Sequence, residues 1–301
     1  MSHHRLRARA KLYASIRTFF NEKAVLEVDV PLLSPAATTD PHIHSCAAQV
    51  NGQTLYLQTS PEFYLKRLLS EYPQAIYSLG KAFRNEESGR NHRAEFTLLE
   101  WYRPGFSLSE LIDEVCELIT RLLPHLPFVQ STYQSLFEEH LGFNPHRIDD
   151  ASLATMALNR VNLVGTCERQ DYLDLLMTHV IEPCLPSAII ISDYPCTQAA
   201  LARIEPNEQG QRVAKRFEIY VNQRELANGY WELIDSGEQA RRFENDNAVR
   251  QANGLPVMPV DSALIEALDS GIPACSGVAV GVDRLLMLIS HAQHIDEVMS
   301  F

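Results

Sequence analysis

Residues 83–102 read FRNEESGRNHRAEFTLLEWY, and a charged loop here joins two apolar, β-rich runs at residues 76–83 and 95–102. An ordinary hairpin loop needs only turn residues, so the concentration of charge suggests a ligand. Arg84 is predicted at a strand end, where its guanidinium could grip a phosphate. Period-2 alternation predicts that Glu86 shares the face of Arg84, and that Glu100 and Tyr102 share a face able to hold an ammonium group. A solvated hairpin with surface ion pairs is the alternative.

A second pattern is three carboxylates, Glu218, Glu225 and Glu232, spaced seven residues apart in a β-rich segment. A two-residue turn at residues 222–223 would place the first two on one sheet face, and a turn or bulge at 228–229 would add the third. Converging carboxylates repel one another unless a cation lies among them. Mg²⁺ or a substrate ammonium would meet that need, whereas the alternative is a solvent-facing acidic hairpin.

The third pattern is residues 277–284, GVAVGVDR, in which small residues alternate with β-branched ones. One strand face would carry Gly277, Ala279 and Gly281, so a flat ligand could approach the backbone closely. Arg284 is predicted at the start of the following helix, where it could meet the same ligand. The spacing matches neither the dinucleotide-binding fingerprint nor the P-loop.

The remaining pattern predicts an α+β fold, with an antiparallel sheet flanked by helices. Helical periodicity or capping signals mark residues 5–22, 60–69, 107–123, 237–253 and 260–269. Strand signals mark residues 25–30, 54–58, 189–192, 213–232 and 276–282. Residues 124–186 are predicted to be a mostly helical insertion within a single catalytic domain that spans residues 1–301.

Composition narrows the function further. The 301 residues are 46 % hydrophobic, which is enough for a sizeable core, and the formal net charge of −12 disfavours broad contact with tRNA. The six cysteines form no CxxC pair, so reduced thiols are expected rather than a zinc site. Neither a signal peptide nor a membrane span is predicted, which favours a cytoplasmic protein.

Together these segments resemble the class II aminoacyl-tRNA synthetases. Residues 28–31 (VDVP) after a long helix resemble motif 1, the FRNE and EFTLLEWY segments resemble motif 2, and GVAVGVDR resembles motif 3. Residues 59–62 (TSPE) and 225–229 (ELANG) are similar to the lysyl enzymes. The predicted motif 1 helix begins near residue 5, which leaves no room for their anticodon-binding domain.

The resemblance is closer to the truncated lysyl-tRNA synthetase paralogues that attach β-lysine to elongation factor P. Residues 85–87 (NEE), 99–104 (LEWYRP) and 275–279 (CSGVA) carry it. Two positions depart from the wider pattern: Ala279 replaces the middle glycine of motif 3, which would narrow the amino-acid pocket, and Arg93 stands where an asparagine is usual. A single methyl group gives only modest discrimination between substrates.

The resemblance implies ATP and Mg²⁺ as ligands and assigns the residues to roles. Catalytic roles fall to Arg84, Glu86 and Arg284, and metal binding falls to Glu218 and Glu225. The amino-acid site would comprise Ser60, Pro61, Glu62, Glu100, Tyr102, Glu232 and Ala279, with Glu232 and Tyr102 on the side-chain ammonium. The ATP site would comprise Arg84, Asn85, Glu86, His92, Arg93, Phe96, Glu225, Leu226, Gly281 and Arg284, with adenine between Phe96 and Arg284.

The implied reaction is activation of (R)-β-lysine or lysine as an adenylate, followed by transfer to a lysine of elongation factor P. The implied assembly is a homodimer with Pro31 near its two-fold axis. A minimal lysyl-tRNA synthetase is one alternative, and a non-catalytic binding or regulatory subunit is another. The second would be expected to carry damaged motifs, yet Arg84, Glu225 and Arg284 are all present.

Overall fold

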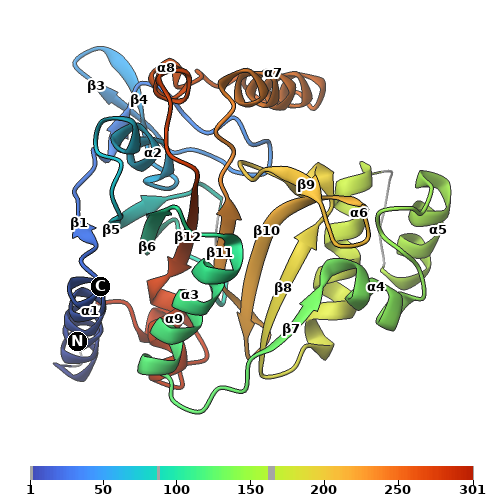
Figure 1. The fold of residues 1–301 in the computed structure, drawn as a ribbon, viewed down its shortest axis with the longest axis horizontal. Coiled ribbons are helices and arrows are strands. Elements are labelled where there is room, and N and C mark those ends of the chain that lie inside the picture. Colours follow the sequence, from blue (N-terminus) through green and yellow to red (C-terminus); the bar gives the residue numbers. More distant parts are fainter. Residues whose placement is uncertain (1–2, 87–88, 162–166, 301) are drawn as a thin grey trace. The chain divides into compact units, whose positions relative to one another are not determined.

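The computed structural model describes residues 3–86, 89–161 and 167–300. Glu87, the third residue of the predicted NEE motif, lies outside the described residues. The chain forms two compact units, the first comprising Met1–Pro124 and Glu232–Phe301 and the second His125–Trp231. Figure 1 follows the chain through both by colour.

In the first unit, four strands pair in the order β1-β5-β6-β12. Its strands are β1 (Leu26–Glu27), β5 (Ile76–Phe83), β6 (Glu95–Pro104) and β12 (Cys275–Gly281). β1 is parallel to β5, whereas β5, β6 and β12 pair antiparallel. β6 therefore lies between β5 and β12, and its centre is buried: Leu99 and Trp101 are fully covered.

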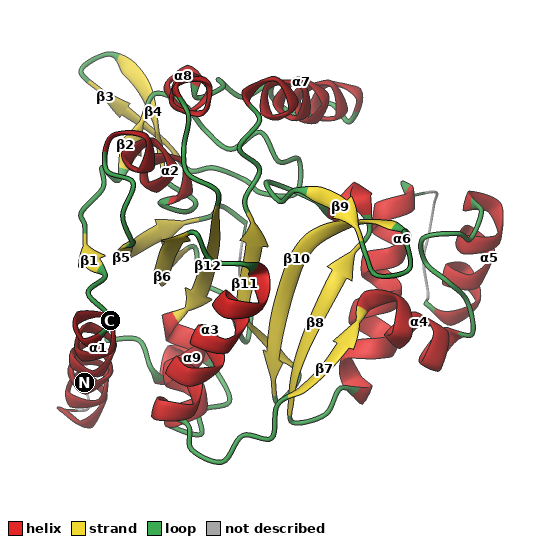
Figure 2. Ribbon diagram, viewed as in Figure 1, coloured by secondary structure: helices red, strands yellow, loops and turns green. Residues whose placement is uncertain are grey.

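Helices accompany this sheet (Figure 2). They are α1 (His3–Glu22), α2 (Glu62–Glu71), α3 (Leu108–Leu122), α7 (Ser236–Ala252), α8 (Ser262–Ser270) and α9 (Val282–Ile289). α2 packs on β5 and α8, α3 contacts β12, and α9 contacts β6. α3 begins with a capping box in which Ser107 and Glu110 satisfy each other's backbone N–H groups. A small separate sheet has the order β2 (Leu33–Ser34), β4 (Gln53–Leu57), β3 (Ala47–Val50).

The second unit has its own strands and helices. Its strands are β7 (Val129–Thr132), β8 (Ala188–Tyr194), β9 (Ile204–Pro206), β10 (Arg212–Val221) and β11 (Arg224–Trp231). β10 pairs antiparallel with β8, β9 and β11, while β7 runs parallel to β8. The helices are α4 (Tyr133–Leu141), α5 (Asp150–Arg160) and α6 (Arg169–Leu176), followed by the short turns η1 (Met177–Ile181), η2 (Glu182–Cys184) and η3 (Cys196–Gln198). Fully buried Phe137, Leu173 and Ile191 belong to one hydrophobic cluster in this unit.

The predicted α+β class is confirmed, and most predicted elements are present within a few residues. The hairpin turn at residues 222–223 is also confirmed, because Asn222 and Gln223 have φ values of +49° and +57°. The predicted break at residues 228–229 is wrong. β11 continues through it, with Asn228 opposite Glu218 and Gly229 opposite Phe217.

Other differences are at the ends of elements. The predicted strand at residues 25–30 shortens to Leu26–Glu27, since only these two residues pair with β5. The helix predicted at residues 260–269 begins at Ser262, because Asp261 caps it by accepting the backbone N–H of Leu264. β3 and β7 were not predicted, because strands of four residues are too short to show a clear period-2 pattern in the sequence.

Candidate active site

Arg84 and Phe96 come together at the base of the hairpin formed by β5 and β6. The backbone N–H of Arg84 donates to Ala94 O at 2.9 Å, which closes the loop. The Arg84 guanidinium lies 5.2 Å from the centre of the Phe96 ring, and its Nε donates to Thr59 O at 3.4 Å. A half-buried cation therefore lies beside an aromatic face, an arrangement that suits a phosphate attached to a flat base.

Glu86 does not share a strand face with Arg84, so that part of the prediction is wrong. β5 ends at Phe83, and Glu86 lies in a turn with φ +63°. Its side chain is 69 % exposed and lies 4.0 Å from His44 Nε2. Asn85 is also exposed, and its backbone N–H donates to His44 O at 2.7 Å. Period-2 reasoning fails here because β5 ends at Phe83, before the chain reaches Glu86.

Arg284 lies beside the same loop, in the first turn of α9. Its Nη2 lies 2.6 Å from His92 Nε2, and its Nε donates to Asn91 O at 3.5 Å. A Cβ on Gly281 would stand 3.6 Å from Arg284 Cδ, which is an ordinary contact. The predicted nucleotide residues His92, Gly281 and Arg284 are therefore neighbours.

A buried carboxylate that the sequence did not single out joins three elements near this region. Asp283 accepts the backbone N–H of Thr97 at 2.6 Å and the guanidinium of Arg9 at 2.6 Å. These bonds tie α1 and β6 to the start of α9. The sequence feature that could have revealed Asp283 is an acidic residue at the end of an apolar run, within the GVDR segment.

Arg93, predicted to contact ATP, forms an ion pair with Asp296 in the short C-terminal helix η4 (Ile295–Glu297). Its Nε donates to Asp296 Oδ1 at 2.7 Å, and both side chains are about half exposed. A second hydrogen bond joins this loop to η4, since the backbone N–H of Ile295 donates to Arg90 O at 2.9 Å. Arg93 would have to exchange partners to reach a phosphate.

The predicted amine-binding residues form one buried group in the first unit. We call Glu62, Lys66, Glu100, Tyr102 and Glu232 the acid cluster. Tyr102 Oη donates to Glu100 Oε1 at 2.8 Å, which confirms that the two side chains share a face of β6. Ser60 Oγ donates to Glu100 Oε2 at 2.7 Å and accepts the backbone N–H of Glu62 at 3.0 Å.

Sequence reasoning missed Lys66, which lies at the centre of this cluster. Its Nζ is 2.7 Å from Glu62 Oε1 and 2.6 Å from Glu232 Oε2, and its side chain is only 1 % exposed. The Glu62–Lys66 spacing of four residues on α2 was the available signal. The contact with Glu232 joins segments far apart in sequence, so no local pattern could have shown it.

Burial and charge act together on the cluster. Burial, and then the neighbouring Glu62 carboxylate, raise the pKa of Glu100 to about 8. Burial and the carboxylates of Glu100, Glu62 and Glu232 raise the pKa of Tyr102, so its side chain stays a protonated phenol. Burial alone would lower the pKa of Lys66, but the Glu232 and Glu62 carboxylates outweigh it and raise that pKa. Lys66 is accordingly a permanent ammonium.

β12 forms a close floor to the cluster. Gly277 lies opposite Tyr102 and Ala279 lies opposite Glu100 in the pairing of β12 with β6. A Cβ at Gly277 would stand 2.5 Å from both Glu232 Oε1 and a ring carbon of Tyr102, so only glycine fits. Pro61, predicted to contact the amino acid, is buried at the N-terminus of α2.

Glu218 and Glu225 belong to the second unit, where the confirmed hairpin turn joins their strands. Glu218 forms an ion pair with Arg216 and accepts Tyr220 Oη at 2.8 Å. The charges of both Glu218 and Glu225 raise the pKa of Glu182 after burial does, so these carboxylates lie near one another. Leu226 is buried next to Glu225 on β11.

This donor set fits a Mg²⁺ that arrives with phosphate, because Mg²⁺ uses one or two carboxylates plus phosphate oxygens and water. Within the described residues, no group of three or more His, Cys, Asp or Glu side chains could hold a metal ion by itself. Glu218 and Glu225 would hold the ion, with Glu218 still bonded to Tyr220 and Arg216.

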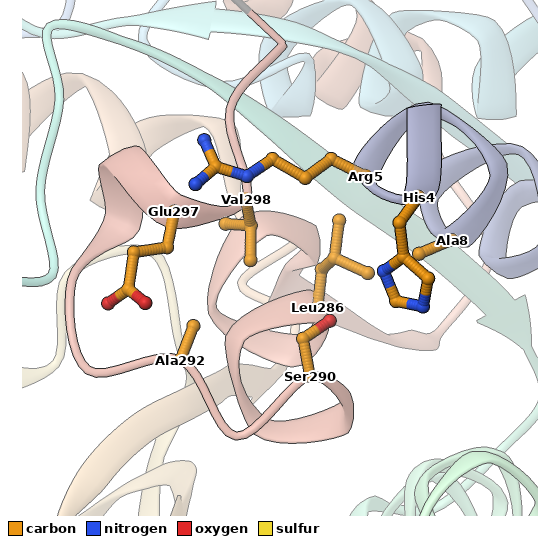
Figure 3. A pocket seen from close by; sticks show the side chains of 8 residues that line it. All are labelled: His4, Arg5, Ala8, Leu286, Ser290, Ala292, Glu297 and Val298. Atoms are coloured by element: carbon orange, nitrogen blue, oxygen red, sulfur yellow. The ribbon is translucent and has the colours of Figure 1, made fainter. Parts of the chain in front are cut away.

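A separate pocket of about 190 Å³ lies between α1 and the C-terminal segment (Figure 3). His4 and Arg5 line it from α1, Leu286 from α9, and Glu297 and Val298 from the residues that follow. Its lining shares no residue with the predicted site. Among the residues described, none of the helices has the length and apolar character needed to cross a membrane.

Comparisons with known proteins identify the family of the chain. The family described as tRNA synthetases class II (D, K and N) matches residues 1–301. A protein of Vibrio vulnificus is 46 % identical over 308 residues, which cover 98 % of this chain and 94 % of the relative. A protein of Klebsiella pneumoniae is 44 % identical over 304 residues, or 97 % of this chain and 93 % of the relative. Both relatives are named elongation factor P--(R)-beta-lysine ligase.

Proposed function

Because the chain belongs to the class II tRNA synthetases of the D, K and N group, we propose that it is a ligase that joins (R)-β-lysine to elongation factor P. Membership confirms the predicted class II fold. The relatives support the reaction, since identity above 40 % extends over nearly the whole of both chains. ATP is the activating substrate that such a ligase requires.

One observation in the structure carries the proposal: the acid cluster already holds a primary ammonium. Glu62 and Glu232 bind the Nζ of Lys66 at 2.7 and 2.6 Å, while Glu100 and Tyr102 bring further oxygen atoms into the same buried group. Buried carboxylates bind cations strongly because little water competes there. A substrate with two amines suits such a site.

The first chemical step would be attack by a carboxylate oxygen of the amino acid on the α-phosphorus of ATP, with departure of pyrophosphate. Arg84, whose guanidinium lies 5.2 Å from the centre of the Phe96 ring, would hold the α-phosphate. Phe96 would stack on the adenine, with Arg284 as the predicted second side of the stack. Charge builds on the phosphate in this step, so a fixed guanidinium lowers the barrier. A Mg²⁺ on Glu218 and Glu225 would neutralise phosphate charge.

The second step would be attack by the ε-amine of a lysine on the acyl carbon, which breaks the bond to AMP and releases it. The adenylate is the activated species, so the protein needs no side-chain nucleophile. Its contribution is to bring the reactants together and to exclude water. Ser60, Glu62 and Glu100 would orient one amine, and Tyr102 and Glu232 the other.

The decisive experiment offers the purified protein ATP and labelled β-lysine or α-lysine, with elongation factor P and bulk tRNA as separate acceptors. Label on elongation factor P, stronger with β-lysine, is the expected result. Label on tRNA instead would replace the proposal with a minimal lysyl-tRNA synthetase. The absence of adenylate with either amino acid would leave only a binding role.

Removal of Arg84 tests the nucleotide site. Arg84→Ala is expected to lower ATP–pyrophosphate exchange at least a hundredfold, of the order found when a charge-stabilising donor is removed. Arg90→Ala is the matched control, because Arg90 is exposed in the same loop and was assigned no role. Near-normal exchange by Arg84→Ala would contradict the assignment.

Several further expectations belong to this proposal. The protein would act in the cytoplasm as a homodimer with Pro31 near the two-fold axis. Residues 124–186 would be an insertion in a single catalytic domain. Glu86, Asn85 and Arg93 would contact ATP after rearrangement of the loop, and Ala279 would favour the β-amino acid. Size-exclusion chromatography with light scattering would test the dimer.

A further inference from the structure

Lys66 is the least expected member of the acid cluster, since it is a buried cation in a site that should bind cations. Its side chain is 1 % exposed, as is that of Glu232. Burial of an ammonium is costly unless hydrogen-bonded anions surround it. Glu62 and Glu232 meet that condition from two different segments of the chain.

The contacts divide the cluster into two halves. Lys66 takes one oxygen each from Glu62 and Glu232, whereas Glu100 is bonded to Ser60 and Tyr102. The second oxygen of Glu232, Oε1, lies towards Gly277, where an added Cβ would stand 2.5 Å away. Glu232 therefore faces Lys66 on one side and the β12 floor on the other.

The charge balance between the cluster and a diamino acid suggests a role for Lys66. Three carboxylates and one ammonium leave two negative charges when all three acids are ionised. A diamino acid whose carboxylate has become a mixed anhydride with AMP carries two ammonium groups and no carboxylate charge. Without Lys66, three buried carboxylates would face two ammonium groups, and the surplus charge would draw in a proton.

We propose that Lys66 is a positioning residue for the amino-acid site: it holds Glu62 and Glu232 in place and sets the charge of the acid cluster to match a diamino acid. The inference rests on the proposed function, because the substrate's two amines define the match. Lys66 would remain bonded to the protein throughout the reaction and would not contact the reacting atoms.

Other residues near α2 do not change the net charge of the acid cluster. Arg67, the next residue on α2, is 37 % exposed and lies 3.5 Å from Asp261 at the start of α8. Within the described residues, β12 faces the cluster with Gly277 and Ala279, which carry no charge. Ser78 on β5 lies opposite Glu100 and is likewise neutral. None of these neighbours adds a charge to the cluster itself.

The test is Lys66→Met, which keeps the length of the side chain and removes its charge. We expect the KM for β-lysine to rise at least tenfold, while the KM for ATP stays within twofold. Binding of β-lysine should also release about one more proton than in the wild-type protein, as measured by calorimetry in buffers of different ionisation enthalpy. The extra proton comes from the carboxylate that loses its ammonium partner.

Two further variants make the result interpretable. Lys66→Arg keeps the charge, so its proton release should match the wild type even where its larger head weakens binding. If Lys66→Met does not fold, the same comparison is made between Lys66→Arg and Lys66→Gln. Arg67→Met removes a neighbouring cation on the same helix and should change neither quantity.

The outcomes separate the two proposals. Unchanged KM or unchanged proton release in a folded Lys66→Met variant would overturn the role of Lys66. Failure of the wild-type protein to label elongation factor P would overturn the proposed function. The calorimetric difference between variants can still be measured then, because it needs only binding of the diamino acid.

Discussion

The acid cluster and the Glu218 region both place carboxylates around a basic side chain, but they do so differently. In the first unit, Lys66 bridges two carboxylates with one point charge. In the second unit, Arg216 pairs with Glu218 and also donates to Gln198 O at 2.9 Å and to Asn228 Oδ1 at 3.2 Å. Among the described residues, the Lys66 ammonium bonds two carboxylates, whereas the Arg216 guanidinium also bonds neutral acceptors.

The difference shows how each basic group limits what its neighbours can bind. A compact ammonium can be surrounded by carboxylates whose other oxygens face elsewhere, as Glu232 Oε1 does towards Gly277. A planar guanidinium is held in a fixed direction by several acceptors. Arg216 and Tyr220 therefore hold Glu218 in one orientation, while the carboxylates of Glu62 and Glu232 surround a single ammonium.

The largest expected effect is at the floor of the acid cluster. Gly277→Ala would place a methyl group 2.5 Å from Glu232 Oε1 and Tyr102, so these side chains must move. We expect kcat/KM for the amino acid to fall at least a hundredfold, together with a loss of about 1–3 kcal/mol of stability from overpacking. Steady-state kinetics and denaturant unfolding measure the two.

Gly80→Ala on the neighbouring strand β5 is the control for that variant. A Cβ at Gly80 would meet only Ser78 Oγ, at 3.9 Å, so activity should change less than threefold. Equal losses in the two variants would mean that the floor of the cluster is no tighter than the rest of the sheet.

A smaller effect is expected in the Glu218 region. Glu218→Gln removes a predicted metal ligand but keeps an oxygen for Tyr220, so the Mg²⁺ concentration for half-maximal pyrophosphate exchange should rise about tenfold. The KM for the amino acid should not change, which would separate the two regions. Glu182→Gln is the control, since Glu182 also bonds Tyr220, at 3.3 Å, and was assigned no metal. An unchanged Mg²⁺ dependence in Glu218→Gln would argue against its ligand role.

The most gradual effect concerns pH. Burial raises the pKa of Glu100 to about 8, so the folded protein binds a proton there that the unfolded chain, with a pKa near 4.3, releases at lower pH. The free energy of unfolding should therefore fall as pH rises from about 5 to 8, by at most about 1.4 kcal/mol per pH unit from this group. Glu100→Gln should lose this part of the slope.

Denaturant unfolding at several pH values measures that slope. Glu95→Gln serves as the matched control, because Glu95 lies on the same strand but is 55 % exposed. A wild-type slope equal to that of Glu100→Gln would show that Glu100 ionises normally. The same raised pKa also predicts that β-lysine binds more tightly at pH 8 than at pH 7, since the dication displaces the proton.

The sequence predicted the class and most elements of the fold because these depend on local signals. The turn at Asn222 and Gln223, the capping by Ser107 and the alternation in β6 all arise from residues close together in the chain. The strong Asn-Gly turn signal at residues 228–229 was overridden, because pairing of β11 with β10 holds both residues in the strand. Backbone pairing across a sheet outweighs a two-residue preference.

The candidate site also has some features that the sequence predicted and others that only the tertiary structure showed. By itself, the sequence determined which residues are predicted to bind ATP and a diamino acid, since Arg84, Glu100, Tyr102, Glu232 and Arg284 stand in a recognisable order. Only the tertiary structure decided that Glu86 leaves the sheet, that Arg93 pairs with Asp296, and that Lys66 lies between Glu62 and Glu232. Spacing along a helix or strand reports which side chains share a face, but contacts between distant segments depend on packing of the whole unit, and no local period records them.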